Sequence, residues 1–262
     1  MSSPAQIIAV MVGNTNTLFG MYDLEKPQQV RGGARRVANG DLAVLADAIT
    51  SLDDEAAIVL ATVNEPVSEA LVAALERITG RRVFRMGVDV GIAMDHRLDP
   101  DTRTGQDRFL AACGAYQLFQ QACVVVDAGT AVTVDFVDGT GVFQGGAIAP
   151  GARMSLLALS RGTAALPDIE LRAPLEDPFG RNSVQAILNG VFYGVRGLVR
   201  TLTERYAEAY EAYPLVVATG GDAELLFSGD ELIERIVPDL ALIGIAVSAA
   251  RALREGEDDD ES

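Results

Sequence analysis

Two glycine-hinged turns, each directly after an apolar run, constrain the fold of this chain more than any other feature. One covers residues 10–17 (VMVGNTNT) and the other covers residues 126–133 (VDAGTAVT). A buried strand that breaks into such a turn can aim backbone N–H groups and threonine hydroxyls at a phosphate. Two copies far apart in the chain suggest two half-sites that close on one nucleotide. The second copy carries a carboxylate, Asp127, where the first has Met11.

Length and composition are those of a two-lobed globular protein with a full core. The 262 residues suffice for two lobes of about 100–150 residues each, and 49% of them are hydrophobic. A net charge of −16 argues against nucleic acid and anionic membranes as partners. Cys113 and Cys123 lie in no metal-ligand spacing, which is typical of buried thiols in a reduced, cytoplasmic protein. We expect no signal peptide and no membrane span.

The pattern of predicted elements recurs in both halves of the chain. Strands are predicted at 6–12, 18–23, 56–62, 82–86, 123–126, 131–137, 142–148 and 215–219. Helices are predicted at 41–52, 68–78 (with Ser68 as N-cap), 107–119, 153–160, 183–210 and 239–254. This predicts an α/β fold of two lobes with a cleft between them, the first at 1–119 and the second at 120–262. The helix at 239–254 could pack back on the first lobe, and residues 255–262 read as a solvated acidic tail.

The segment Gly105-Gln106-Asp107-Arg108 is the best candidate for acid–base chemistry. It follows an irregular loop and opens a helix, where Asp107 could simply favour the helix dipole. The functional interpretation is a general base beside a guanidinium. Phosphorylation of an alcohol needs an acceptor for its proton, and Arg108 could hold a substrate carboxylate through two parallel hydrogen bonds.

Other candidates are weaker when each is taken alone. Asp127 could form an ordinary Asx turn or share a cation with ATP phosphates. Ser183 could cap the long helix or meet a small polar substrate. His96, the only histidine, has no serine or cysteine nucleophile motif beside it, so we interpret it as a loop residue. Glycine pairs at 145–146 and 220–221, together with Gly151, could let backbone approach a flat ligand.

Six motifs in this order resemble those of the type III pantothenate kinases, which belong to the actin-like, sugar-kinase-like ATPase superfamily. The resemblance runs from residue 7 to about residue 253. Its motifs are residues 13–17 (GNTNT), 105–108 (GQDR), 127–133 (DAGTAVT), 145–151 (GGAIAPG), 180–183 (GRNS) and 219–221 (TGG). The resemblance implies two ribonuclease-H-like lobes, a homodimer, and transfer of the ATP γ-phosphate to the 4′-hydroxyl of pantothenate, the first step of coenzyme A synthesis.

The resemblance also implies a role for each motif. Asp107 would accept the proton, and Gly105, Gln106, Asp107, Arg108 and Ser183 would bind pantothenate. ATP would be bound by Met11, Val12, Gly13, Asn14, Thr15, Asn16, Thr17, Leu18 and Thr130. Asp127 would hold the monovalent cation, K⁺ or NH₄⁺, which acts with Mg²⁺.

Two departures from the family pattern keep other functions open. Met11 stands where the family has an aspartate that helps to place Mg²⁺, and a thioether is a poor ligand for a hard cation. The family's substrate-contacting tyrosine is also missing, because no tyrosine lies between Tyr22 and Tyr116. The alternatives are a family member with little or no turnover that binds ligands or regulates, and a kinase for another small hydroxylated acid.

Overall fold

The computed structural model describes residues 6–53, 55–102, 104–175 and 177–260, with residues 256–260 described by backbone alone. The chain divides into two compact units. The first lobe comprises Met1–Gln120, Gly141–Phe143 and Asp239–Ser262, and the second lobe comprises Gln121–Thr140 and Gln144–Pro238. In the described residues, no helix is both long and apolar enough to cross a bilayer.

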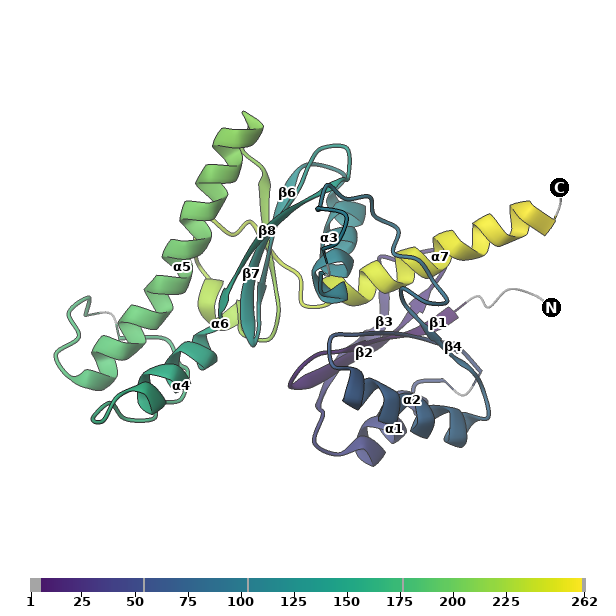
Figure 1. The fold of residues 1–262 in the computed structure, drawn as a ribbon, viewed down its shortest axis with the longest axis horizontal. Helices are drawn as coiled ribbons and strands as arrows, with labels where there is room; N and C mark the ends of the chain where they lie inside the picture. The colour runs from purple at the N-terminus through teal and green to yellow at the C-terminus, as the bar shows by residue number, and fades with distance from the viewer. Residues whose placement is uncertain (1–5, 54, 103, 176, 261–262) are drawn as a thin grey trace. The chain divides into compact units, whose positions relative to one another are not determined.

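The first lobe is a five-stranded mixed sheet with helices on both faces (Figure 1). Its strands are β1 (Gln6–Val12), β2 (Asn16–Asp23), β3 (Val30–Ala38), β4 (Ala57–Thr62) and β5 (Val83–Arg85), in the order β3-β2-β1-β4-β5. The central strand β1 pairs antiparallel with β2 and parallel with β4. The parallel strands β1, β4 and β5 therefore end at one edge, where ligands of open α/β sheets bind.

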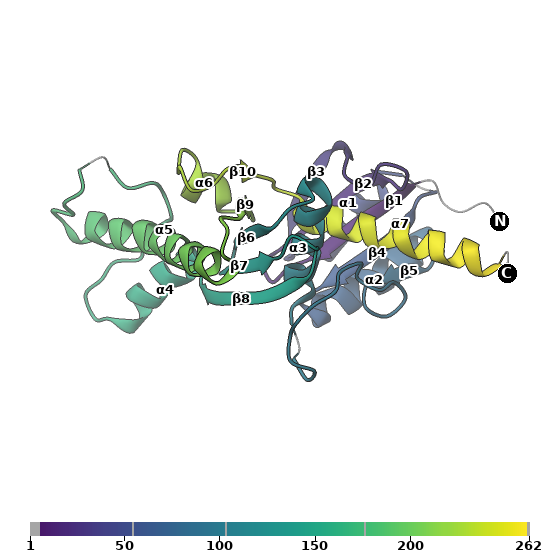
Figure 2. The ribbon, with the colours of Figure 1, turned by 90° about the horizontal axis from the view of Figure 1, so that it is seen from above.

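Alternate residues of β1 face different helices. Ile8, Val10 and Val12 pack in a core with residues of α1 (Leu42–Thr50) and α2 (Glu65–Thr79). The opposite face is covered by α3 (Gln106–Phe119) and α7 (Leu240–Asp260), which pack against each other. Because side chains alternate along a strand, Met11 points to the α3 and α7 side. Figure 2 shows α7 crossing β1 and β4.

The second lobe repeats the same strand order. Its strands are β6 (Cys123–Ala128), β7 (Ala131–Val137), β8 (Phe143–Pro150), β9 (Leu215–Thr219) and β10 (Arg235–Ile236), in the order β10-β9-β6-β7-β8. Its helices are α4 (Ala152–Gly162), α5 (Ser183–Tyr210) and α6 (Ala223–Phe227). The inner face of α5 packs on alternate valines of β6 and β7. As in the first lobe, the central strand has an antiparallel hairpin on one side and a parallel strand on the other. The predicted α/β fold with two ribonuclease-H-like lobes is confirmed.

Several local predictions differ from the structure. Strands β3 and β10 and helix α6 were not predicted, because β3 is mostly exposed and the other two are very short. Helix α2 begins at Glu65 with Asn64 as its cap, so Ser68 is not the cap but a buried residue of the first turns. Helix α7 continues to Asp260, so the acidic segment to that point is helical. Cys113 and Cys123 are free and buried, and burial raises the pKa of their thiols to about 11 and about 12.

Candidate active site

The turn after β1 is held in shape by Asn39, which follows β3. Its side chain accepts a hydrogen bond from the Thr17 hydroxyl at 2.8 Å and donates one to the Gly13 carbonyl at 2.8 Å. Its backbone N–H donates to the Thr15 carbonyl at 3.0 Å. The Gly13 N–H donates to the Asn16 carbonyl, which a Cβ on Gly13 would approach to 2.8 Å, so this position favours glycine. The sequence analysis missed Asn39. Its only sequence signal is the glycine that follows it, since Asn-Gly pairs often mark turns.

Side chains of the predicted ATP-binding segment 11–18 differ in accessibility. Met11, Val12 and Thr17 are buried, with Met11 6% exposed. Asn14 and Thr15 are exposed. Because the Thr17 hydroxyl donates to Asn39, Thr17 supports the turn from inside. Asn14 and Thr15 are therefore the accessible residues of this turn, whereas Met11, Val12 and Thr17 lie beneath it.

Gln106 ties the start of α3 to the ends of two parallel strands. Its amide oxygen accepts a hydrogen bond from the Thr62 N–H at 3.2 Å, and its amide nitrogen donates to the Met86 carbonyl at 2.9 Å. The neighbouring Val63 N–H donates to the Val12 carbonyl at 3.0 Å. The structure thus brings residues 105–108 to the same sheet edge as the turn after β1. Gln106 was expected to contact substrate, whereas its amide is engaged by backbone on both sides.

The Asp107 carboxylate lies close to Gly105 at the first turn of α3. Its Oδ1 accepts a hydrogen bond from the Arg108 backbone N–H at 2.9 Å, and a Cβ on Gly105 would lie 2.5 Å from that oxygen. Burial raises the pKa of Asp107, and this effect outweighs the opposing influence of the Arg108 N–H and guanidinium. A carboxylate with a raised pKa is a stronger proton acceptor, which suits a general base.

The turns after β8 and β9 pack closely against residues 127–130, where β6 ends. Gly220 follows β9 with φ of 98°, and a Cβ there would lie 2.3 Å from Asp127 Oδ1. Gly151 follows β8, and its N–H donates to the Thr130 carbonyl at 3.1 Å. A Cβ on Gly151 would lie 2.3 Å from the Gly129 carbonyl oxygen. These approaches require glycine at both positions.

An ion pair that sequence reasoning missed borders these turns. The Arg153 Nε and Nη2 atoms lie 3.0 and 2.9 Å from Asp222 Oδ1. Asp222 is 6% exposed, and its N–H donates to the Ala128 carbonyl at 2.9 Å. No local sequence pattern predicts this ion pair, because Arg153 and Asp222 are far apart in the chain.

The described part of the chain has no group of three His, Cys, Asp or Glu side chains that could hold a metal ion. Asp127 is half-buried, and a Cβ on Gly220 would lie 2.3 Å from its Oδ1 and 2.4 Å from the Ala128 carbonyl oxygen, so these two oxygens lie near each other. A carboxylate among carbonyl oxygens is the donor set that hard cations prefer. Asp127 therefore fits a cation that takes its remaining oxygens from phosphates and water.

Ser183 lies in the first position of α5, not at one of these strand ends. It is exposed, and the neighbouring Asn182 caps the helix by accepting a hydrogen bond from the Gln185 N–H at 2.9 Å. The interpretation of Ser183 as the N-cap is therefore wrong. Its hydroxyl has no capping role in this helix.

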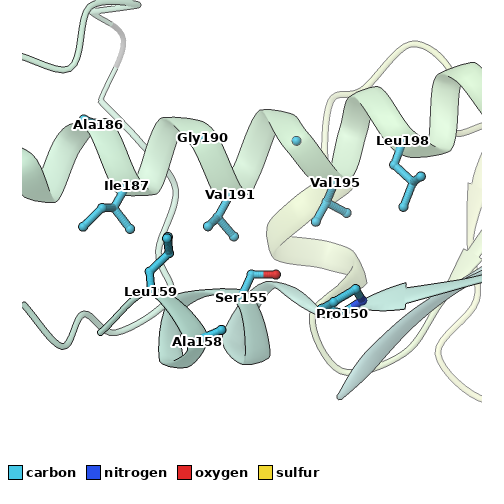
Figure 3. A pocket seen from close by; sticks show the side chains of 11 residues that line it. Pro150, Ser155, Ala158, Leu159, Ala186, Ile187, Gly190, Val191, Val195 and Leu198 are labelled. Carbon is cyan, nitrogen blue, oxygen red and sulfur yellow. The ribbon is translucent and has the colours of Figure 1, made fainter. Parts of the chain in front are cut away.

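A separate apolar groove of about 690 Å³ runs between α4 and α5 (Figure 3). Side chains of Leu159 and Ser155 face Ile187 and Val191 across it. On α5, Gly190 and Gly194 also line the groove, and a Cβ on either would meet no atom within 4 Å. The groove is therefore open along the α5 backbone.

Comparison with known sequences identifies one family. The sequence profile described as type III pantothenate kinase matches residues 7–205. The chain is 30% identical over 248 residues to a type III pantothenate kinase of Syntrophotalea carbinolica, covering 92% of this chain and 97% of the relative. It is 33% identical over 251 residues to that of Jannaschia sp., covering 92% and 95%.

Solved structures share the fold at lower identity. A conserved putative Baf family transcriptional activator from Campylobacter jejuni aligns with a TM-score of 0.62 and 20% identity, covering 96% of this chain and all of that one. An activator of 2-hydroxyisocaproyl-CoA dehydratase from Clostridium difficile, with bound ADPNP, aligns with a TM-score of 0.50 and 14% identity, covering 98% and 97%. At these identities the likeness shows the fold alone.

Proposed function

Because the chain belongs to the type III pantothenate kinase family, a family of phosphotransferases, we propose that it transfers the γ-phosphate of ATP to the 4′-hydroxyl of pantothenate. This reaction is the first step of coenzyme A synthesis, and we place it in the cytoplasm. The observation that carries the proposal is the first turn of α3. There Gly105 and Gln106 fix a half-buried carboxylate, Asp107, at the sheet edge that also holds the turn after β1.

In this proposal each motif has one task. Asp107 accepts the proton of the attacking hydroxyl, and its raised pKa supports that role. Arg108 binds the carboxylate of pantothenate, because a guanidinium matches a carboxylate with parallel N–H donors. The family resemblance alone assigns the Ser183 hydroxyl a role in binding pantothenate. Backbone N–H groups of residues 11–18, with Thr130, bind the phosphates of ATP.

The proposed cofactors are ATP, Mg²⁺ and a monovalent cation, K⁺ or NH₄⁺. When bound, Mg²⁺ would neutralise phosphate charge during transfer. Asp127 would hold the monovalent cation, and its half-buried carboxylate near the Ala128 carbonyl oxygen supports this role. Mg²⁺ would depend on ATP oxygens and water, since it often keeps several waters and few protein ligands.

Met11 favours a second candidate function. It is 6% exposed and supplies a thioether where the family resemblance leads us to expect a carboxylate. If that carboxylate is indispensable, the protein binds ATP and pantothenate without transferring phosphate, and it acts as a ligand-binding or regulatory member of the family.

One experiment separates these functions. ADP release is measured with ATP, Mg²⁺, K⁺ and pantothenate for the wild type, for Asp107→Asn and for the control Asp47→Asn, which changes an exposed residue of α1. The kinase proposal expects turnover in the wild type and the control, and a loss of about 10²–10⁴-fold in kcat for Asp107→Asn. No turnover, together with calorimetric binding of ATP or pantothenate, would support the ligand-binding function.

We further propose that the protein is a homodimer that uses the groove between α4 and α5. The elements around the groove expose large apolar side chains, among them Ile148, Met154 and Tyr193. Exposed apolar patches next to a groove are typical of protein interfaces. Gly190→Leu should fill the groove and give a monomer in light scattering, whereas Gly190→Ala should leave a dimer. A wild-type monomer at micromolar concentration would refute this proposal.

A further inference from the structure

The ring of Phe143 is completely buried beside the first turn of α3. Its exposed fraction is 0%, and the Arg108 Cζ lies 5.7 Å from the ring centroid, within the range of a cation–π contact. The Phe109 ring lies 4.7 Å from the Phe143 ring, measured between centroids. All three residues belong to the first lobe, although Phe143 comes from the start of β8.

The backbone of Phe143 is fixed as firmly as its ring. Its N–H donates to the Asp95 carbonyl at 2.9 Å, and its carbonyl accepts from the Arg97 N–H at 2.9 Å. These bonds join it to the loop that precedes α3. The His96 ring continues the stack, 5.3 Å from the Phe109 ring between centroids. A buried ring held on both sides is a rigid surface against which a long side chain can be ordered.

We propose that Phe143 is a positioning residue that orients Arg108 and thereby selects substrates with a carboxylate. This inference rests on the proposed function, in which Arg108 binds the carboxylate of pantothenate. A guanidinium can stack flat on an aromatic ring, and in that arrangement its N–H groups can still donate in the guanidinium plane. Ordering the side chain before substrate arrives also lowers the entropy lost on binding.

The test compares two substrates that differ only in the group that Arg108 would bind. KM and kcat are measured for pantothenate and for its neutral alcohol analogue, in which the carboxylate is replaced by CH₂OH. The variants are Phe143→Leu and Phe143→Met, the second because methionine fills a core position flexibly. The matched control is Phe84→Leu, which removes another cation–π contact of the first lobe, with Arg82 Cζ 5.3 Å from that ring centroid. Circular dichroism and thermal unfolding show which variants are folded.

We expect the Phe143 variants to raise the KM for pantothenate about three- to tenfold, with little change in kcat, in the KM for ATP or in the KM for the alcohol analogue. Phe84→Leu should leave the pantothenate-to-alcohol KM ratio unchanged. The inference is overturned if folded Phe143 variants keep the wild-type ratio, or if Phe84→Leu changes it equally.

The same comparison can be made without turnover. Calorimetry gives the Kd of pantothenate and of the alcohol analogue for each folded variant, so a wild type that binds but does not phosphorylate still tests Phe143. Turnover with an unchanged ratio refutes the role of Phe143 and leaves the proposed function standing. A wild type that neither binds nor phosphorylates pantothenate refutes both.

Discussion

At the scale of single residues, the position of Asp107 links the proposed activity to the stability of the fold. Its carboxylate is half-buried, and the resulting loss of hydration raises its pKa. A carboxyl whose pKa is higher in the folded than in the unfolded state binds more protons when folded. The fold is therefore most stabilised by this group at low pH, and that contribution is lost as the pH rises from the unfolded pKa through the folded pKa.

Replacement of Asp107 should therefore stabilise the protein while inactivating it. We expect Asp107→Asn to raise the unfolding temperature at neutral pH relative to the wild type, with the difference shrinking as the pH falls into the ordinary range of carboxyl pKa values. Thermal unfolding of both proteins across pH measures this. A variant that is less stable than the wild type at neutral pH would show that the Asp107 charge is well solvated or paired, and would contradict the raised pKa.

Met11 is the residue whose replacement should most increase activity. Met11→Asp places a carboxylate beside the turn that we propose binds phosphate, and we expect kcat to rise by about tenfold or more, since charge stabilisation of this kind is often worth several kcal/mol. The unfolding temperature should fall, because the position is only 6% exposed. Met11→Leu is the control with similar volume. Steady-state kinetics that give equal kcat for Met11→Asp and Met11→Leu would show that the missing carboxylate is not limiting.

At the scale of elements, helices α3 and α7 approach each other closely at two glycines. A Cβ on Gly114 would lie 2.2 Å from the Leu240 carbonyl oxygen, and a Cβ on Gly244 would lie 2.0 Å from the Leu110 carbonyl oxygen. Both glycines meet backbone, which cannot move aside cheaply. The position of α3, and with it Asp107, thus depends on a helix from the other end of the chain.

Gly244→Ala should destabilise the protein by about 1–3 kcal/mol through overpacking. Gly190→Ala makes the same change in α5, where a Cβ meets no atom within 4 Å, and should stabilise by about 0.5–1 kcal/mol through helix propensity. Urea unfolding at a protein concentration that fixes the oligomeric state measures both. Equal effects of the two substitutions would mean that α3 and α7 can move apart without a cost in stability.

Elements with strong periodicity could be predicted, and those shaped by context could not. The strands at 6–12 and 131–137 match β1 and β7 in both bounds, because each is a nearly continuous apolar run. Strand β3 was missed because seven of its nine residues are exposed, which removes the pattern on which prediction depends. The start of α2 was misplaced because Asn64 and Ser68 are both good caps, and only the bonded Val67 N–H tells them apart.

At the scale of the whole molecule, the duplicated strand order is the feature that the sequence indicates least directly. The two lobes show the orders β3-β2-β1-β4-β5 and β10-β9-β6-β7-β8, without a close sequence repeat. The glycine-hinged turns are recognisable because a strand followed by glycine and small polar residues is a local pattern. Asn39 and Phe143 are not recognisable, because their roles arise from residues distant in sequence, and Gln106 is recognisable in its motif although its distant backbone partners are not.

We propose above all that this protein makes a phosphate ester of the pantothenate alcohol with Asp107 as the base. Phosphorus NMR of a reaction with ATP, Mg²⁺, K⁺ and pantothenate tests it most directly. We expect a phosphate monoester signal that couples to the methylene protons of the primary alcohol, grows in step with ADP, and is lost with Asp107→Asn. Inorganic phosphate as the sole product, or ester formation undiminished in Asp107→Asn, would contradict the claim.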